Sequence, residues 1–336
     1  MANINQKTFH IVCVDDSATN QQLLNSVLDK HGYKVTSIDD GQKALDYIAA
    51  NPSVDLILLD IMMPNMDGYT VCQYLKSSPI LSRIPVIFLT AYNDIEALTK
   101  SFEVGGVDYI IKPFRTKELL IRIQTHLKLK FYQDQELEKT QYELIAMMGS
   151  LAESHHSDTA RHVERVGEYA ALIAKLLGFS EEHASIIKSA SMLHDIGKVT
   201  TPDCVLNKPE KLTEDEFAIM KQHALAGYHS LSCSTLPLFQ VAAIIAHEHH
   251  EKYDGSGYPR GLKGEAIHIF GRIVAFADVF DAISSSRSYK KGWPLNEIYS
   301  YIKSMRGKHF DPKIVDLFFD NFSLFLDIKE KYEKPL

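Results

Sequence analysis

The chain has 336 residues and a formal net charge of −7 at pH 7, which is long enough for about two domains of ordinary size. With 45% hydrophobic and 24% charged residues it has the composition of a globular protein, and it contains no basic run that would indicate nucleic-acid binding. Four dispersed cysteines without a CxxC pair, no signal-like N-terminus and no long apolar run predict a cytoplasmic protein with reduced thiols and no membrane insertion.

Short apolar runs alternate with amphipathic stretches in the first part of the chain. The predicted strands are 9–14, 33–38, 54–59, 85–89 and 107–111, and the predicted helices are 17–31, 40–50, 66–77 and 94–105. Strands that alternate with helices predict an α/β fold with a doubly wound, parallel, five-stranded sheet. In such sheets, ligands bind beyond the carboxyl ends of the strands.

Polar residues stand at those strand ends. They are Asp15 and Asp16 at the first strand, Asp60 at the third, Thr90 at the fourth and Lys112 at the fifth. Three converging carboxylates repel one another unless a cation lies between them, and Mg²⁺ prefers carboxylate oxygens and water. A lysine supplies a point charge for a phosphoryl oxygen. Each aspartate alone could be a helix cap, but the five residues together predict a Mg²⁺ and phosphoryl site.

The segment LDIMMPNMDG at 59–68, with Asp15-Asp16, Thr90-Ala91 and Lys112-Pro113-Phe114, resembles the receiver domain of two-component response regulators over about residues 8–127. The resemblance implies that Asp60 accepts a phosphoryl group from a sensor histidine kinase and that Asp15 and Asp16 bind Mg²⁺ with it. Thr90 and Lys112 would hold the phosphoryl oxygens, and Tyr109 would be the aromatic switch residue.

Residues 115–151 are polar and of helical period. Leucines recur every seven residues at Leu137, Leu144 and Leu151. This repeat is typical of a coiled-coil seam that pairs two chains. Lys130 and Thr140 interrupt the seam, so an amphipathic helix lying on its own domain fits equally well. We expect a homodimer formed through this helix or the receiver domain, and a continuous helix would be able to transmit a change to the second half.

From residue 152 onward the helical period predicts an all-α domain without strands. A capping box at Thr213–Glu216 predicts the start of the helix that carries His223. Asp311-Pro312 predicts the start of a late helix. We therefore expect a receiver domain over 1–127, a helical linker over 128–150 and a helical domain over 151–336.

The second half contains many residues that bind metal ions. The candidate ligands are His162, His194, Asp195, His223, His249, His250 and Asp278, with Asp158 on the helix face of His162. His194 and Asp195 would diverge by about 100° on a helix, so they would reach different ions or the carboxylate would bridge two. Mixed imidazole and carboxylate ligands suit first-row transition metals better than Mg²⁺, and the surplus of ligands predicts a multinuclear centre. His247 and the remaining histidines are expected to be core, surface or supporting residues.

Four motifs carry a second resemblance. They are HDIGK at 194–198, His223, HHE at 249–251 with DGSGYP at 254–259, and Asp278 with Asp281-Ala282 and Arg287. Their order and spacing over about residues 148–325 resemble the HD-GYP family, whose members hydrolyse cyclic di-GMP and belong to the wider HD phosphohydrolase superfamily.

This resemblance implies roles for single residues. The seven candidate ligands would bind two or three ions, most readily iron or manganese, with His162 serving the third. Lys198 and Asp195 would act at the scissile phosphate, and Tyr258, Arg287 and Lys290 would contact the cyclic dinucleotide. One position departs from the family: Asp158 stands where the family often has glutamate, four residues before the upstream histidine. The shorter side chain leaves two and three ions both open.

The two resemblances together predict phosphorylation-regulated hydrolysis of cyclic di-GMP to pGpG, with GMP as a further product left open. The alternative is a catalytically weak HD-GYP module that binds cyclic di-GMP or a partner protein without turnover, for which Asp158 leaves room. A generic HD phosphohydrolase acting on another phosphate ester is a third reading, which the DGSGYP loop disfavours.

Overall fold

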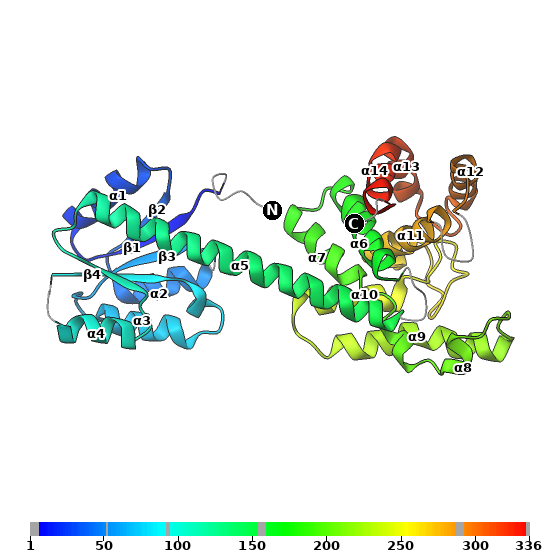
Figure 1. The fold of residues 1–336 in the computed structure, drawn as a ribbon, viewed down its shortest axis with the longest axis horizontal. Helices are drawn as coiled ribbons and strands as arrows, with labels where there is room; N and C mark the ends of the chain where they lie inside the picture. The colour runs from blue at the N-terminus through cyan, green and yellow to red at the C-terminus, as the bar shows by residue number, and fades with distance from the viewer. Residues whose placement is uncertain (1–6, 52, 92–94, 154–158, 286–291, 334–336) are drawn as a thin grey trace. The chain divides into compact units, whose positions relative to one another are not determined.

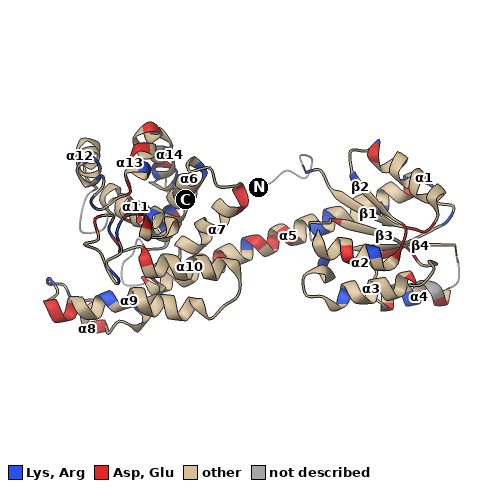
Figure 2. Cartoon of the chain, turned by 180° about the vertical axis from the view of Figure 1, so that it is seen from behind, with Lys and Arg blue, Asp and Glu red and all other residues tan. Residues whose placement is uncertain are grey.

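A computed structural model describes residues 7–51, 53–91, 95–153, 159–285 and 292–333. The chain divides into two compact units, Met1–Lys139 and Thr140–Leu336 (Figure 1). Among the helices of the described segments, none is both long and apolar enough to cross a lipid bilayer. Figure 2 shows acidic and basic residues interspersed over the helices of both units.

The first unit is built on a parallel sheet. Its strands are β1 (His10–Val14), β2 (Lys34–Ile38), β3 (Leu56–Asp60), β4 (Val86–Thr90) and β5 (Asp108–Ile111). They pair in the order β2-β1-β3-β4-β5, and every pairing is parallel. This confirms the predicted five-stranded doubly wound sheet. The strand order reverses between β1 and β3, which is where such folds place their ligand site.

Helices cover both faces of this sheet. They are α1 (Ala18–Asp29), α2 (Gly41–Ala50), α3 (Gly68–Ser77) and α4 (Ile95–Glu103), with a short 3-10 helix η2 (Leu81–Arg83). Successive strand residues point to opposite faces: Ile11 and Cys13 pack with α1, whereas Val12 and Val14 pack with α2 and α3. Burial on both faces explains why these strands are almost continuously apolar.

A single helix, α5 (Thr116–Ala152), runs through the region predicted to be helical. Its first turns pack on the sheet through Leu119, Ile123 and Leu127, which all lie in the core of the first unit. Its last turns belong to the second unit, where Ile145 is part of the core. The seven-residue repeat lies on a different side of these last turns, because Leu144 and Leu151 are 54% and 67% exposed.

The second unit is helical. It contains α6 (Thr159–Leu176), α7 (Glu181–Ser191), η3 (Ile196–Thr200), α8 (Asp203–Leu206), α9 (Glu214–Ser232), α10 (Pro237–Glu248), η4 (Gly264–Ala266), α11 (Ile269–Ser284), α12 (Leu295–Met305), α13 (Pro312–Asp320) and α14 (Phe322–Glu333). Its described residues form no strand beyond one isolated bridge, Arg306 to Phe310, so the all-α prediction is confirmed.

Capping and core packing set this helical arrangement. The capping box between Thr213 and Glu216 and the Asp311 cap are both present, as predicted. Helices α10 and α11 are apolar on most sides and lie in the core, where they pack against each other. A Cβ on Gly197 would lie 2.0 Å from the carbonyl oxygen of His223, so only glycine allows η3 to approach α9 this closely.

Candidate metal centre and phosphoacceptor site

The candidate phosphoacceptor site lies where β1 and β3 end. Lys112 Nζ is 2.7 Å from Asp15 Oδ2 and 2.7 Å from Asp60 Oδ2. Asp15, Asp16 and Asp60 each offer an oxygen within 4.8 Å of the others, which is the arrangement expected around one Mg²⁺ ion. Burial raises the pKa of Asp60, and the neighbouring Lys112 only partly offsets that rise.

Local backbone geometry fixes these carboxylates. Asn20 Nδ2 donates to both oxygens of Asp15 at 3.0 Å, and the Ser17 amide donates to Asp15 Oδ1 at 2.9 Å. A Cβ on Gly68 would lie 2.2 Å from the Asp60 carbonyl oxygen, so the loop after β3 folds tightly back on the strand end. The structure thus brings the predicted aspartates and Lys112 to one edge of the sheet.

The two remaining predicted receiver residues lie on neighbouring strands. Thr90 is buried at the end of β4, and its carbonyl accepts from the Lys112 amide at 2.6 Å. Tyr109 is half-buried on β5, with its ring 6.0 Å from that of Phe102 and 5.8 Å from the Arg122 guanidinium. Tyr109 therefore lies close to side chains of both α4 and α5.

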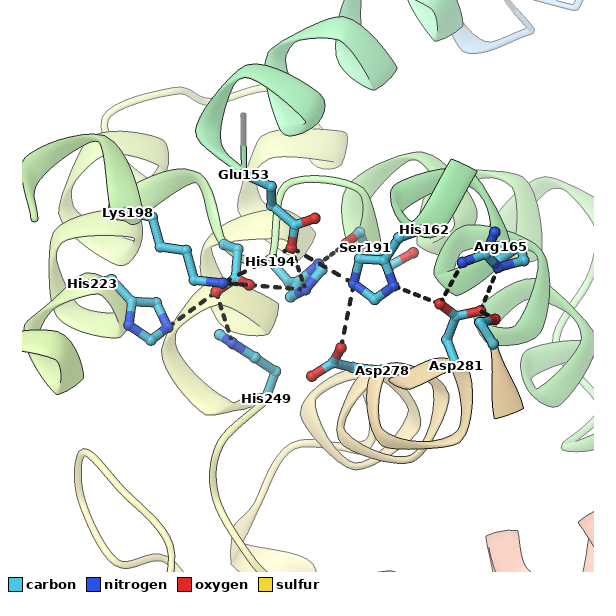
Figure 3. A network of polar contacts seen from close by, with 12 residues as sticks. Glu153, His162, Arg165, Ser191, His194, Lys198, His223, His249, Asp278 and Asp281 are labelled. Atoms are coloured by element: carbon cyan, nitrogen blue, oxygen red, sulfur yellow. Dashed lines mark hydrogen bonds and ion pairs between the residues drawn. The ribbon is translucent and has the colours of Figure 1, made fainter. Parts of the chain in front are cut away.

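The second unit gathers four of the predicted metal ligands into a first group. It comprises Asp195, His223, His249 and His250, whose ligand atoms all lie within 4.8 Å of one another. Asp195 Oδ1 is 3.1 Å from His223 Nε2 and 3.6 Å from His249 Nε2 (Figure 3). These residues come from the turn after α7, from α9 and from the end of α10, so distant segments converge on one point.

The same part of the structure contains buried polar atoms that lack hydrogen bonds. Among the described residues, these atoms include Nε2 of His194, His223 and His249 and Oδ1 of Asp195. Burying such atoms without a partner costs free energy, and native structures rarely tolerate several in one place. Cations bound beside these atoms would satisfy them.

The opposite nitrogens of these histidines are already engaged. His194 Nδ1 is 2.8 Å from the Ser191 carbonyl oxygen, and His223 Nδ1 is 2.6 Å from that of Met220. His249 Nδ1 is 3.1 Å from the Ile245 carbonyl oxygen. A carbonyl can only accept, so Nδ1 carries a proton and Nε2 is the atom that faces the shared space. This arrangement leaves Nε2 as the atom that would coordinate a metal ion.

A second group lies beside the first. It comprises Glu153, His162 and His194, again with ligand atoms within 4.8 Å of one another. His162 Nε2 is 3.6 Å from Glu153 Oε1 and 3.5 Å from Asp278 Oδ1, and Asp278 points from α11 toward the same space (Figure 3). His194 Nε2 is also 3.3 Å from Asp195 Oδ2, so the two groups adjoin.

Three predicted site residues, Asp158, Arg287 and Lys290, lie outside the described residues. Glu153 was not predicted. It lies in the turn after α5, nine residues before His162, and no helical period relates the two positions. The only signal in the sequence is that a carboxylate follows the end of a long amphipathic helix. This pattern is too common to identify a ligand.

The predicted helical geometry of His194 and Asp195 is wrong. Helix α7 ends at Ser191, and both residues lie in a turn that leads into η3. The turn is needed because η3 packs directly on α9 through Gly197. The two side chains nevertheless reach different groups, as expected, with Asp195 in the first and His194 in the second.

The electrostatics favour a cation. Burial lowers the pKa of His194, but Asp195, Asp278 and Glu153 more than offset this and raise it to about 10. Burial also lowers the pKa values of His249 and His250, so both are neutral and able to coordinate. In the metal-free state His194 thus carries a proton, because the carboxylates around it favour a positive charge at this place.

Lys198 and Asp195 form a close pair. Lys198 Nζ donates to Asp195 Oδ2. Burial acts to lower the pKa of Lys198, but Asp195 and Glu153 raise it overall, so the amine stays charged. Burial alone would raise the pKa of Asp195, yet Lys198 and His194 hold it well below its usual range. A fixed positive charge therefore borders the first group.

His162 is held from behind by a buried ion pair. Asp281 Oδ2 accepts from His162 Nδ1 at 2.6 Å. Arg165 donates to both carboxylate oxygens of Asp281 at 2.6 and 2.9 Å, and the Ser285 hydroxyl donates to Oδ1 at 3.2 Å. A carboxylate behind a ligating imidazole fixes its tautomer and ring direction (Figure 3).

Two buried glutamates fold the DGSGYP loop against the metal ligands. Glu251 accepts from the backbone amides of Arg260 at 2.8 Å and Leu262 at 3.0 Å, while Glu248 accepts from the His268 amide at 2.6 Å. The loop places the Tyr258 ring 4.7 Å from that of His250. Tyr258 therefore forms a wall of the first group. His247 instead stacks on Tyr228 at 4.5 Å and belongs to neither group.

Comparisons with known proteins agree with this division. A family model described as a response regulator receiver domain matches residues 11–124, and one described as an HD domain matches residues 146–314. The chain is 40% identical over 326 residues to the cyclic di-GMP phosphodiesterase response regulator RpfG of Xanthomonas campestris pv. campestris, a match that covers 91% of this chain and 86% of that protein.

Two further relatives bear on the second unit. A cyclic di-GMP phosphodiesterase of Thermotoga maritima is 37% identical over 332 residues, which cover 92% of this chain and 89% of that protein. The 3′3′-cGAMP-specific phosphodiesterase 2 of Vibrio cholerae is 44% identical over 194 residues, which cover 58% of this chain and 37% of that protein.

Proposed function

This chain belongs to the family of response regulators that carry an HD domain behind a receiver domain, and we propose that it hydrolyses cyclic di-GMP under the control of phosphorylation at Asp60. One observation carries the proposal for the second unit: the buried, unpartnered Nε2 and Oδ1 atoms of the first group face one another. Metal ions held by such a cluster would activate the attacking water and neutralise charge on the phosphodiester.

The donor set fits two neighbouring transition-metal ions. Asp195, His223, His249 and His250 would hold one, and His162, His194 and Asp278 would contribute to a second. Imidazole-rich ligands with carboxylates suit iron or manganese. The proposal includes both a centre of two ions and a centre of three. When bound, such ions activate water and neutralise charge on a phosphodiester. In the receiver unit, Asp15, Asp16 and Asp60 would hold Mg²⁺.

The protein's own groups position the substrate. We assign the Lys198 ammonium to a non-bridging oxygen of the scissile phosphate, where it stabilises the charge that develops as water adds to phosphorus. The bond from phosphorus to the 3′ oxygen breaks, that oxygen takes up a proton, and linear pGpG results. Tyr258 would pack against the bound dinucleotide, and Arg287 and Lys290 would pair with its phosphate or guanine edges.

A second substrate has a specific observation in its favour. A 3′3′-cGAMP-specific phosphodiesterase is 44% identical to this chain over 194 residues. The two substrates differ in one purine base, so the residues that contact the bases decide between them. The two relatives named above whose matches cover more than nine tenths of this chain are both named as cyclic di-GMP phosphodiesterases, which makes cyclic di-GMP the first choice.

The receiver unit defines the other partners. A sensor histidine kinase would phosphorylate Asp60, and we propose that two copies associate through the receiver or through the exposed leucines of α5. The functional boundaries we propose are a receiver domain over 1–127, a linker over 128–150 and an HD-GYP domain over 151–336. Kinase and cyclic dinucleotide signalling take place in the cytoplasm, which is the location we assign.

The test is a turnover assay on full-length protein purified under reducing conditions and loaded with Mn²⁺ or Fe²⁺. Cyclic di-GMP, 3′3′-cGAMP and pGpG are offered separately and together, and products are separated by chromatography. We expect pGpG from cyclic di-GMP, and no product from Asp195→Ala. A protein that is fully loaded with metal and binds cyclic di-GMP but releases no product would instead be a binding module.

A further inference from the structure

The end of α5 docks closely on the turn that carries the metal ligands. Ile145 and Ala152 are buried against the second unit. Between them, a Cβ on Gly149 would lie 2.2 Å from the carbonyl oxygen of Met192 and 3.0 Å from a methyl of Val163. Glycine thus lets the backbone of α5 touch the chain two residues before His194, so the position of the helix end is coupled to that of the turn.

The residue that follows α5 enters the metal centre. Glu153 has a side chain only 9% exposed, and its Oε1 is 3.6 Å from His162 Nε2 and 3.9 Å from His194 Nε2. It is also 3.9 Å from Lys198 Nζ. Two ligands that each bind one ion at about 2.0–2.2 Å lie about 3–4 Å from each other. The separations to both histidines therefore fit a shared ion better than direct hydrogen bonds.

We propose that Glu153 is a ligand of the ion held by His162 and His194, so that the linker helix completes the metal centre. The proposal rests on the proposed function only in that the centre binds metal ions. Glu153 takes the carboxylate role that the family pattern would give to Asp158, the residue four positions before His162. The longer side chain reaches the ion from a different segment, the turn at the end of α5.

This ligand gives the receiver a direct means of control. Helix α5 begins at Thr116, within the receiver unit, and ends one residue before Glu153. A shift or rotation of its last turn moves the Glu153 carboxylate away from His162, and it moves Met192 through the Gly149 contact. The state of the receiver then changes the affinity of the protein for the second ion, because one ligand of that ion is attached to the helix that moves.

The experiment counts metal ions in full-length protein. Glu153→Gln keeps the size of the side chain and removes its charge, Asp158→Asn tests the position favoured by the family pattern, and Glu138→Gln is a matched control on an exposed carboxylate of α5. Each protein is equilibrated with Mn²⁺ at graded concentrations, bound metal is measured by mass spectrometry, and circular dichroism checks the fold.

We expect Glu153→Gln to bind one ion at least about 10–100-fold more weakly than wild type, while the first ion is unchanged. Glu153→Asp should recover part of the loss, and Asp158→Asn and Glu138→Gln should match wild type. Wild-type metal binding by Glu153→Gln, or loss of an ion in Asp158→Asn instead, would overturn the assignment. The assay uses no substrate, so its outcome is independent of which cyclic dinucleotide is hydrolysed.

The control step has its own measurement. Beryllofluoride, a phosphoryl analogue, is added with Mg²⁺ to wild-type protein, and the Mn²⁺ titration is repeated. We expect the midpoint of the weaker ion to shift, and the shift to disappear in Glu153→Gln. An unchanged midpoint in wild-type protein that has bound beryllofluoride would show that α5 does not control this ion.

Discussion

Replacing Asp281 with asparagine should destabilise the second unit strongly and weaken metal binding at His162. Asp281 is fully buried and accepts hydrogen bonds from His162, Arg165 and Ser285. Breaking a buried ion pair by removing one partner costs about 3–5 kcal/mol of unfolding free energy. An asparagine would also turn an amide NH₂ toward Arg165 or His162, where the carboxylate had accepted. Loss of the group that orients His162 should lower metal affinity about 10–100-fold.

The chain offers a matched control. Asp316 forms the same two-bond pair with Arg306, with both distances at 2.7 Å, but the pair is exposed to solvent. Exposed pairs contribute little because water and salt screen them, so Asp316→Asn should leave stability and metal content nearly unchanged. The comparison therefore isolates burial and contact with His162 from the chemistry of the pair itself.

A single tryptophan allows the unfolding of the second unit to be followed separately. Trp293 is the only tryptophan in the chain and packs against the core of the second unit. Urea unfolding followed by its fluorescence reports the free energy of unfolding of that unit in the metal-free protein. Bound metal is counted separately. Equal effects of Asp281→Asn and Asp316→Asn on both readouts would refute the argument that burial makes the first pair important.

Three further predictions follow from the same contacts. Asp60→Asn should abolish the response to a phosphodonor while the transition-metal content of the second unit and basal turnover stay at wild-type values; loss of those ions would show that the units are not functionally separate. Glu251→Gln should raise KM more than it lowers kcat and leave metal content intact, because it frees the backbone of the loop that holds Tyr258; a fall in kcat alone would contradict this. His194 has a pKa of about 10 without metal, so ion binding at pH 7 should release about one proton per chain, and affinity should rise with pH until the pKa is passed. Calorimetry in buffers of different ionisation enthalpy measures this release, and none would mean that His194 is neutral before binding.

The receiver fold was predictable because its signals are local. Short apolar runs that end in polar residues located every strand to within two residues. The details at strand ends were less accurate: Asp60 is the last residue of β3 rather than the first residue after it, because hydrogen bonding to β4 continues through it. Parallel pairing then brings Asp15 and Asp60 together without further information from the sequence.

The metal centre was predictable only in part. Motif spacing identified His223 and His249, whose convergence depends on packing that no local pattern encodes. The turn at His194 departs from the predicted helix because η3 must contact α9. Glu153 could not be found, since its relation to His162 is purely tertiary and the spacing argument favoured Asp158. Long-range contacts that are not carried by a repeating pattern are invisible in a single sequence.

The Nε2 atoms that face one another have a consequence for the integrity of the fold. His162 lies on α6, His223 on α9, His249 at the end of α10 and Asp278 on α11, so ions bound between them join segments that are far apart along the chain. Ligand binding to the native state alone adds about 2.7 kcal/mol of stability when the free ion exceeds its dissociation constant a hundredfold. In a metal-starved cell the same helices are held only by apolar packing and by polar contacts such as the Arg165–Asp281 pair. The supply of ions then governs the lifetime of the enzyme against proteases as well as its turnover.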